Sequence, residues 1–385
     1  MPYITEILSK VILDSSGFPT VECEVFTESG AYGRASSASL YSSKTTIKDL
    51  RDKDSSKYFG LGVNKAVDNI NLEIEKALIG EDCREQVRID NKLNKLDNTI
   101  NKTKLGLNAI SAVSLAIARA ASDYTGLSLH SYLGGAVKRS IPSPLVTIYK
   151  HNGIEIIFDP MKDKIIESLR LLKEVSFMVK ENLHTENKSL KDVIQEIIKI
   201  AGKLYYKNNI DYSIYLNMFM DDFYDAKTKE YNFESLKKTQ EIIDYYDMLV
   251  KRFNIDGFID PLYHADNDGY KKLTKRLTNR SKIIGYNYFE SNRRRIEKAI
   301  SSATVNAVML SITEIGTISE ISDLIEYLRD NNIYVYLSAS ENESEDSFIA
   351  DLGVALSINK IRLLSINSSG SIPKFNELIR IENSL

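Results

Sequence analysis

From about residue 140 onward, short apolar or β-branched runs alternate with amphipathic helical stretches, and this repetition constrains the fold more than any other feature. Eight such runs occupy residues 145–148, 154–158, 213–219, 257–260, 283–285, 308–310, 334–337 and 361–366. Successive strand–helix units with short connections are typical of a parallel sheet covered by helices. Eight strands over roughly 240 residues fit a closed barrel better than an open sheet. We therefore predict the α/β class, with a (β/α)8-type barrel that includes a charged helical stretch over residues 162–209.

The first part of the chain follows a different pattern. Residues 20–25 alternate between polar and apolar side chains, which indicates a strand, and Ser29-Gly30 marks a turn before a return strand over residues 31–35. Helical spacing covers residues 63–79 and 105–125, and the second helix is expected to end near Gly126. We predict an α+β domain over residues 1–138 and the barrel domain over residues 139–385.

The charge and the apolar pattern exclude several kinds of partner. The 385-residue chain carries 50 basic and 53 acidic residues, so its formal charge of -3 gives no strong field for nucleic acid or an anionic membrane. No apolar run reaches the ~18 residues that a membrane-spanning helix requires. Cys23 and Cys83 lack metal-ligand spacing and are expected to be reduced thiols. We expect a cytoplasmic protein that neither binds nucleic acid nor inserts into a membrane.

In a barrel of this kind, functional side chains project from the carboxyl ends of the strands. The predicted ends carry Asn217, Ile259, Asp260, Tyr286, Asn287, Ser311, Ser338 and Ser365. A magnesium site requires two or three converging carboxylates, and Asp260 is the one carboxylate in this set.

Two further motifs favour ordinary structural roles. The sequence Asp266-Asn267-Asp268-Gly269 is similar to the start of a calcium loop, but it lacks a Glu at the twelfth position and suits a helix N-cap better. The four His residues are scattered without metal-ligand spacing. Neither motif predicts a metal site.

Several stretches in the same order along the chain resemble the enolase (phosphopyruvate hydratase) family. They are VILDSSGFPTVECEVFTESGAYGRAS, LRDKDSSKYFGLGVNKAVDNIN, KLGLNAISAVSLAIARAASDYTGL, YLGG, KKLTKRL, EIGTISE, SEDSFIADLGVA and KFNELIRIE. The resemblance implies a (β/α)8-type enolase barrel with an N-terminal α+β capping domain. It also implies a homodimer and the magnesium-dependent dehydration of 2-phosphoglycerate to phosphoenolpyruvate.

The residues that this chemistry needs are replaced at the matching positions. The family's three metal-binding carboxylates fall on Asn217, Ile259 and Tyr286, and its catalytic Lys falls on Ser311. Family segments of the types GGEHA and GDEGGFAP have no counterpart between residues 152 and 211. We therefore predict no bound magnesium and no other cofactor.

The substrate-binding positions are altered in the same way. The family's phosphate-binding Ser-His-Arg-Ser loop becomes Ser338-Ala339-Ser340-Glu341, and a substrate-binding Lys falls on Arg362. In the mobile loop of the family, Ser42 is retained, although one hydroxyl is not a metal site.

Residues that matter for assembly are kept. Glu22 and Arg380 match family positions that pair across the dimer interface, whereas a second pair, Lys10 with Asn383, has lost its acidic member. The sequence thus predicts a homodimer weaker than an ordinary enolase dimer.

Three hypotheses about function follow. The favoured one is an enolase-like pseudoenzyme that acts as a binding or assembly subunit, as a homodimer or in a larger assembly. A second is a residual or repurposed lyase of the enolase superfamily that uses Asp260, Glu341 and Arg362. A third is a subunit that pairs with an authentic enolase and regulates it.

Overall fold

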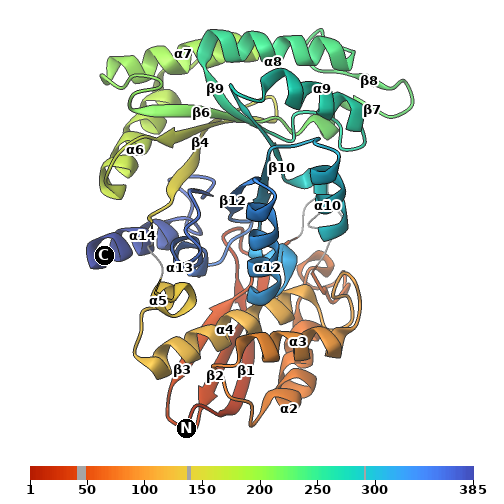
Figure 1. Ribbon diagram of the computed structural model, residues 1–385, viewed down its shortest axis with the longest axis vertical. Coiled ribbons are helices and arrows are strands. Elements are labelled where there is room, and N and C mark those ends of the chain that lie inside the picture. Colours follow the sequence, from red (N-terminus) through yellow and green to blue (C-terminus); the bar gives the residue numbers. More distant parts are fainter. Residues whose placement is uncertain (41–48, 137–139, 290–291) are drawn as a thin grey trace.

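The computed structural model describes residues 1–40, 49–136, 140–289 and 292–385. An N-terminal domain of three strands and several helices lies against one end of a larger barrel (Figure 1). The N-terminus lies at the end of the smaller domain that is remote from the barrel.

The smaller domain is an antiparallel sheet with the order β1-β2-β3. Its strands are β1 (Ile4–Leu13), β2 (Pro19–Thr27) and β3 (Tyr32–Ser36). Its helices are η1 (Tyr58–Gly60), α1 (Asn64–Asn69), η2 (Ile70–Ile74), α2 (Glu75–Leu78), α3 (Gln86–Asp97), α4 (Leu107–Thr125) and α5 (Leu129–Gly134). The α+β prediction is confirmed, although β1 was not predicted.

Small residues allow α4 to lie unusually close to the sheet. A Cβ atom built on Gly33 would lie 2.0 Å from the carbonyl oxygen of Ala116, so only glycine fits at this crossing. The helix ends at Gly126, which has a left-handed φ of 65°, as predicted. This close contact joins the sheet and α4 into one apolar core.

Eight strands close into a barrel with the order β10-β11-β12-β13-β4-β5-β6-β9. The strands are β4 (Ser143–His151), β5 (Ile154–Pro160), β6 (Tyr212–Asn217), β9 (Ile255–Ile259), β10 (Lys282–Gly285), β11 (Ala307–Leu310), β12 (Tyr334–Ser338) and β13 (Lys360–Arg362). Strands β7 (Tyr224–Asp225) and β8 (Glu230–Tyr231) form a separate hairpin. All eight predicted runs contribute to the barrel, and the last is shorter than predicted.

The expectation of an entirely parallel sheet is wrong for one strand. Strand β5 runs antiparallel to both β4 and β6. The reason is the tight turn at Asn152 and Gly153, where φ is 47° and 88°, because two residues can join antiparallel strands but cannot provide a parallel crossover. This reversal brings the beginning of β5, rather than its end, to the barrel mouth.

Helices cover the outside of the barrel (Figure 1). The helices of this part of the chain are α6 (Ile165–Asn182), α7 (Leu190–Lys203), η3 (Met220–Phe223), α8 (Thr239–Phe253), α9 (Asn267–Leu277), η4 (Asn287–Phe289), α10 (Arg293–Ser301), α11 (Ile312–Ile315), α12 (Ile318–Asp330), α13 (Phe348–Ala355) and α14 (Ile372–Ser384). The charged stretch over residues 162–209 is helical, as predicted, and forms α6 and α7. The Asp266 carboxylate caps α9 by accepting from the Gly269 amide, which confirms the N-cap interpretation.

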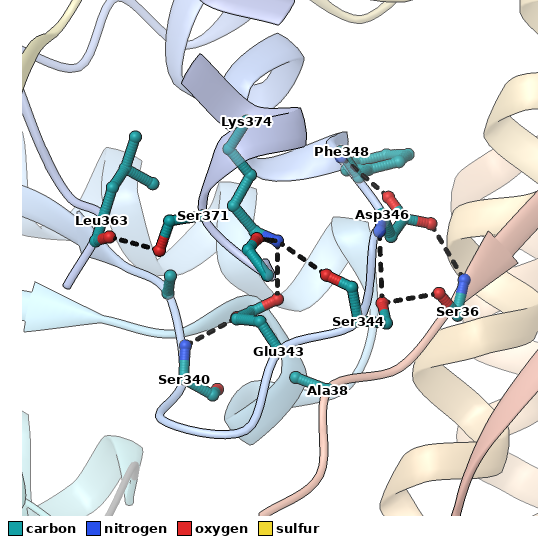
Figure 2. A network of polar contacts seen from close by, with 12 residues as sticks. Ser36, Ala38, Ser340, Glu343, Ser344, Asp346, Phe348, Leu363, Ser371 and Lys374 are labelled. Atoms are coloured by element: carbon teal, nitrogen blue, oxygen red, sulfur yellow. Dashed lines mark hydrogen bonds and ion pairs between the residues drawn. The ribbon is translucent and has the colours of Figure 1, made fainter. Parts of the chain in front are cut away.

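Polar contacts hold the two domains together (Figure 2). The Asp346 carboxylate accepts from the Ser36 amide at 2.9 Å, and the Ser36 and Ser344 hydroxyls lie 2.7 Å apart. Arg119 of α4 donates to both oxygens of Asp346, at 2.7 and 2.8 Å. A two-point contact between guanidinium and carboxylate fixes orientation as well as distance, so it sets how the small domain sits on the barrel.

Candidate functional site at the barrel mouth

Strand register places two predicted site positions, Asn217 and Ile259, in one row with Glu155 and Ile284, which were not predicted. Glu155 pairs with Asn217, Asn217 with Ile259, and Ile259 with Ile284 on adjacent strands. All four residues are buried. A row across neighbouring strands at one level of a barrel is where a ligand-binding set would have to converge.

The polar centre of this row is an ion pair. Arg362 of β13 donates from Nη2 to Oε2 of Glu155 at 2.5 Å and from Nη1 to the Ser338 hydroxyl at 3.2 Å. Asn217 donates from Nδ2 to the same Glu155 oxygen at 3.1 Å, and Lys150 contacts the other oxygen at 2.9 Å. Burial alone would raise the pKa of Glu155, but Arg362 and then Lys150 outweigh it and lower the pKa to about 2. We call Glu155, Arg362, Asn217 and Lys150 the mouth cluster.

Ile259 belongs to an apolar layer inside the barrel. Its neighbours in this layer include Leu145, Tyr215 and Met309, with Tyr286 packed against them. An aliphatic side chain offers no lone pair, so this position contributes packing only.

Tyr286 follows β10 and turns its hydroxyl toward an acidic partner. The phenol donates to Oε1 of Glu314 at 3.0 Å. Burial, and secondarily the charge of Glu314, raises the pKa of Tyr286 well above its usual value. The side chain is therefore a neutral hydrogen-bond donor at physiological pH.

Two further predicted positions, Ser311 and Ser340, form a small hydroxyl cluster with Thr313, which was not predicted. The hydroxyls of Ser311, Thr313 and Ser340 lie 3.1 to 3.3 Å from one another and are buried. The Ser340 amide donates to Glu343, which also pairs with Lys374 at 3.1 Å, as Figure 2 shows. Ala339 is buried beside them and offers no polar side-chain atom.

Asp260 has a structural role. Its carboxylate accepts backbone N–H groups from Tyr286, Asn287 and Tyr288 at 2.9, 2.8 and 3.3 Å. Burial raises the pKa of Asp260 to about 6 despite these bonds. The carboxylate thus fixes the turn after β10, while Glu341, the other acidic candidate, is exposed.

These side chains do not fit a magnesium ion. Magnesium prefers charged oxygen ligands in an octahedral arrangement, usually carboxylates. Ile259 has no donor atom, Asn217 could offer only its uncharged amide oxygen, and the Tyr286 hydroxyl keeps its proton for Glu314. Within the described residues, no three or more His, Cys, Asp or Glu side chains are grouped so that they could hold a metal ion.

The positions expected at a dimer interface have partners within the chain. Glu22 is nearly buried, with Lys10 at 3.2 Å and Arg34 at 3.8 Å, whereas Arg380 is exposed and pairs with Glu377 of the same helix at 2.8 Å. Ser42 lies outside the described residues.

Sequence reasoning missed Glu155, Lys150 and Glu314. Glu155 is a lone acid in the apolar run 154–158, and an acid inside a buried strand indicates a buried partner. It was overlooked because only the carboxyl ends of strands were considered, and β5 runs in the opposite direction.

Together, the capping domain, the closed eight-stranded barrel and the row of side chains at its mouth define a capped protein with a (β/α)8-type barrel in which one strand is reversed. The family model described as Enolase, N-terminal domain, matches residues 4–133, and the one described as Enolase, C-terminal TIM barrel domain, matches residues 178–385. The chain belongs to the enolase family. The fold class predicted from the sequence is therefore confirmed. Among the described helices, none combines the length and apolarity needed to cross a membrane.

Proposed function

We propose that this chain is a catalytically inactive member of the enolase family that acts as a binding or assembly subunit. The observation that carries the proposal is the mouth cluster, in which Arg362 neutralises Glu155 inside the barrel. Because the Arg362 guanidinium is hydrogen-bonded to Glu155 and Ser338 inside the barrel, it would have to give up these contacts to bind an anionic substrate.

The chemistry implied by the family supports the proposal. Removing a carbon-bound proton next to a carboxylate creates a dianion, which needs metal ions or comparable positive charge for stabilisation. It also needs a base, and Ser311 is held among other hydroxyls without a basic partner in its cluster. Because general-base catalysis is typically worth about 10² to 10⁴ in rate, its loss together with the metal ligands removes several contributions at once.

A repurposed enzyme is the weaker alternative. Of the polar groups that it could use, Arg362 is paired with Glu155 and Asp260 is occupied by three backbone N–H groups. Such a reaction would first have to break these contacts.

For assembly, we propose a homodimer in which Glu22 contacts Arg380 of the partner subunit. A two-fold axis would repeat this pair, since the same patch serves both chains. Pairing with an authentic enolase through the same surface is the related possibility, because the interface residues would be shared.

The test is an activity assay with magnesium and 2-phosphoglycerate. The purified protein should form no phosphoenolpyruvate above background. The variant Ser311→Lys should also remain inactive, because a restored base would still lack charge stabilisation for the dianion.

An intact enolase assayed in parallel is the positive control. A melting-temperature measurement with magnesium and a substrate analogue adds a readout that does not depend on turnover, and it should show no saturable rise. Sustained, magnesium-dependent product formation that host enzyme does not explain would refute the proposal.

A further inference from the structure

A groove of about 490 Å³ lies between α8 and α9 on the outside of the barrel. It is lined by Asp244, Asp247, Met248, Lys251, Arg252 and Arg276. The two helices are neighbours in Figure 1, and β9 begins at Ile255, directly after α8 ends. The groove therefore lies toward the amino ends of the strands, away from the mouth cluster.

One buried carboxylate at the groove holds three cations. Asp247 Oδ2 contacts Lys251 Nζ and Arg276 Nη2, each at 2.8 Å, and Oδ1 contacts Arg280 Nη2 at 2.7 Å. Hydrogen bonding from Lys251, together with Arg280 and Arg276, holds the pKa of Asp247 well below its usual range even though the carboxylate is buried. Asp247 thus stays ionised and fixes the positions of the three cations.

The groove has more positive charge than its own acids can neutralise. Lys251, Arg252, Arg276 and Arg280 are opposed by Asp244 and Asp247, a surplus of two positive charges on a chain whose net charge is -3. Two of the ion pairs, those of Arg276 and Arg280, join the α9 side to Asp247 of α8, whereas Lys251 lies on α8 itself and pairs with Asp247 within that helix. The surplus positive charge is available to a further anion.

Donor groups of these cations face solvent. The side chains of Lys251, Arg276 and Arg280 are 64%, 53% and 39% exposed. In the described part of the chain, the contacts of Arg276 and Arg280 use only Nη2 of each guanidinium. The rest of each planar fork can bind an anion through two parallel N–H bonds.

We propose that this groove binds a small phosphate monoester through Lys251, Arg276 and Arg280. A phosphate monoester carries about −1.5 to −2 charges at neutral pH, which matches the surplus. Asp247 holds the cations in place before binding, so less side-chain freedom is lost when the anion arrives. Met248 provides an apolar wall for the organic part of the ligand. This site goes beyond the proposed function, because it uses no residue of the mouth cluster.

Isothermal titration calorimetry of the full chain at constant ionic strength tests the proposal. Inorganic phosphate and glycerol phosphate are the probes, and sodium chloride is the salt control. Saturable binding of both phosphates is expected. Arg276→Gln should weaken it roughly tenfold or more, since a hydrogen bond to a charged group is worth about 1.5–3 kcal/mol. Arg293→Gln is the matched control, because Arg293 is 51% exposed and also pairs with a carboxylate, Glu297, at 2.9 Å.

Lys251→Gln provides a second decisive variant if Arg276→Gln does not fold, since it leaves both guanidinium contacts to Asp247 intact. It should weaken phosphate binding while circular dichroism remains unchanged. Absence of saturable binding to the unmodified protein, or equal weakening by Arg276→Gln and Arg293→Gln, would overturn the proposal. Binding of an RNA oligonucleotide without binding of either small phosphate would also overturn it.

Discussion

Replacing Glu155 with Gln would leave the Arg362 guanidinium buried in the barrel without its carboxylate. Folding holds the pKa of Glu155 at about 2, compared with an ordinary value of 4.5. That difference corresponds to about 3 kcal/mol of unfolding free energy at neutral pH. Independently, removing one partner of a buried ion pair typically costs about 3–5 kcal/mol. We therefore expect Glu155→Gln to lower the unfolding free energy by about 3 kcal/mol at pH 7.

The pH dependence of stability provides a second readout. Because the pKa of Glu155 is lower in the folded state, its stabilisation is fully present above pH 4.5 and is lost as the pH falls toward 2. Urea denaturation between pH 6 and pH 2.5 should show this loss in the unmodified protein. The part contributed by Glu155 should be missing from the Glu155→Gln variant.

Two controls separate the buried pair from surface charge. Glu73→Gln removes an acid from an exposed pair with Lys104 at 3.2 Å, so it should cost about 1 kcal/mol or less. The double variant Glu155→Met with Arg362→Met should recover most of the lost stability, because it removes both buried charges. The explanation fails if Glu155→Gln costs no more than Glu73→Gln.

The remaining predictions concern the domain junction and assembly. Burial, and then the charge of Glu377, raises the pKa of Asp351 to about 7. The unfolding free energy should therefore fall as the pH rises from about 4 to 7, and Asp351 should add no further pH dependence above 7. Asp351→Asn should remove this slope in denaturation curves and stabilise the protein at pH 8, by up to about 4 kcal/mol; an unchanged slope would contradict the assignment. For assembly, Arg380→Glu should dissociate the proposed dimer, and adding Glu22→Arg should partly restore it. Light scattering measures both effects, and a monomeric unmodified protein at tens of micromolar would exclude the dimer.

Much of the fold could be predicted because it depends on local periodicity. The eight apolar runs produced eight barrel strands, since a buried strand needs a continuous apolar sequence whatever its neighbours are. The α4 helix ended at Gly126 because only a residue that tolerates positive φ ends a helix in this way. These features are determined within a few residues of the chain.

The identity of the side chains at the mouth was also available from the sequence. Asn217, Ile259, Tyr286 and Ser311 are uncharged wherever the chain places them, so the loss of the three metal-binding carboxylates and the Lys that the resemblance implies follows from residue type. What those residues do instead was not available, because their hydrogen-bond partners come from other elements of the fold, as Glu314 of α11 does for Tyr286.

Tertiary structure alone decided the electrostatics of the barrel. Local sequence determined both the strand over residues 154–158 and, through the turn at Asn152 and Gly153, its reversed direction, which brings Glu155 to the mouth. There it meets Arg362, more than two hundred residues away in the chain. Local sequence fixes backbone conformation through sterics and burial. The pairing of Glu155 with Arg362 depends instead on closure of the barrel, because only the closed barrel brings the two side chains within hydrogen-bonding distance.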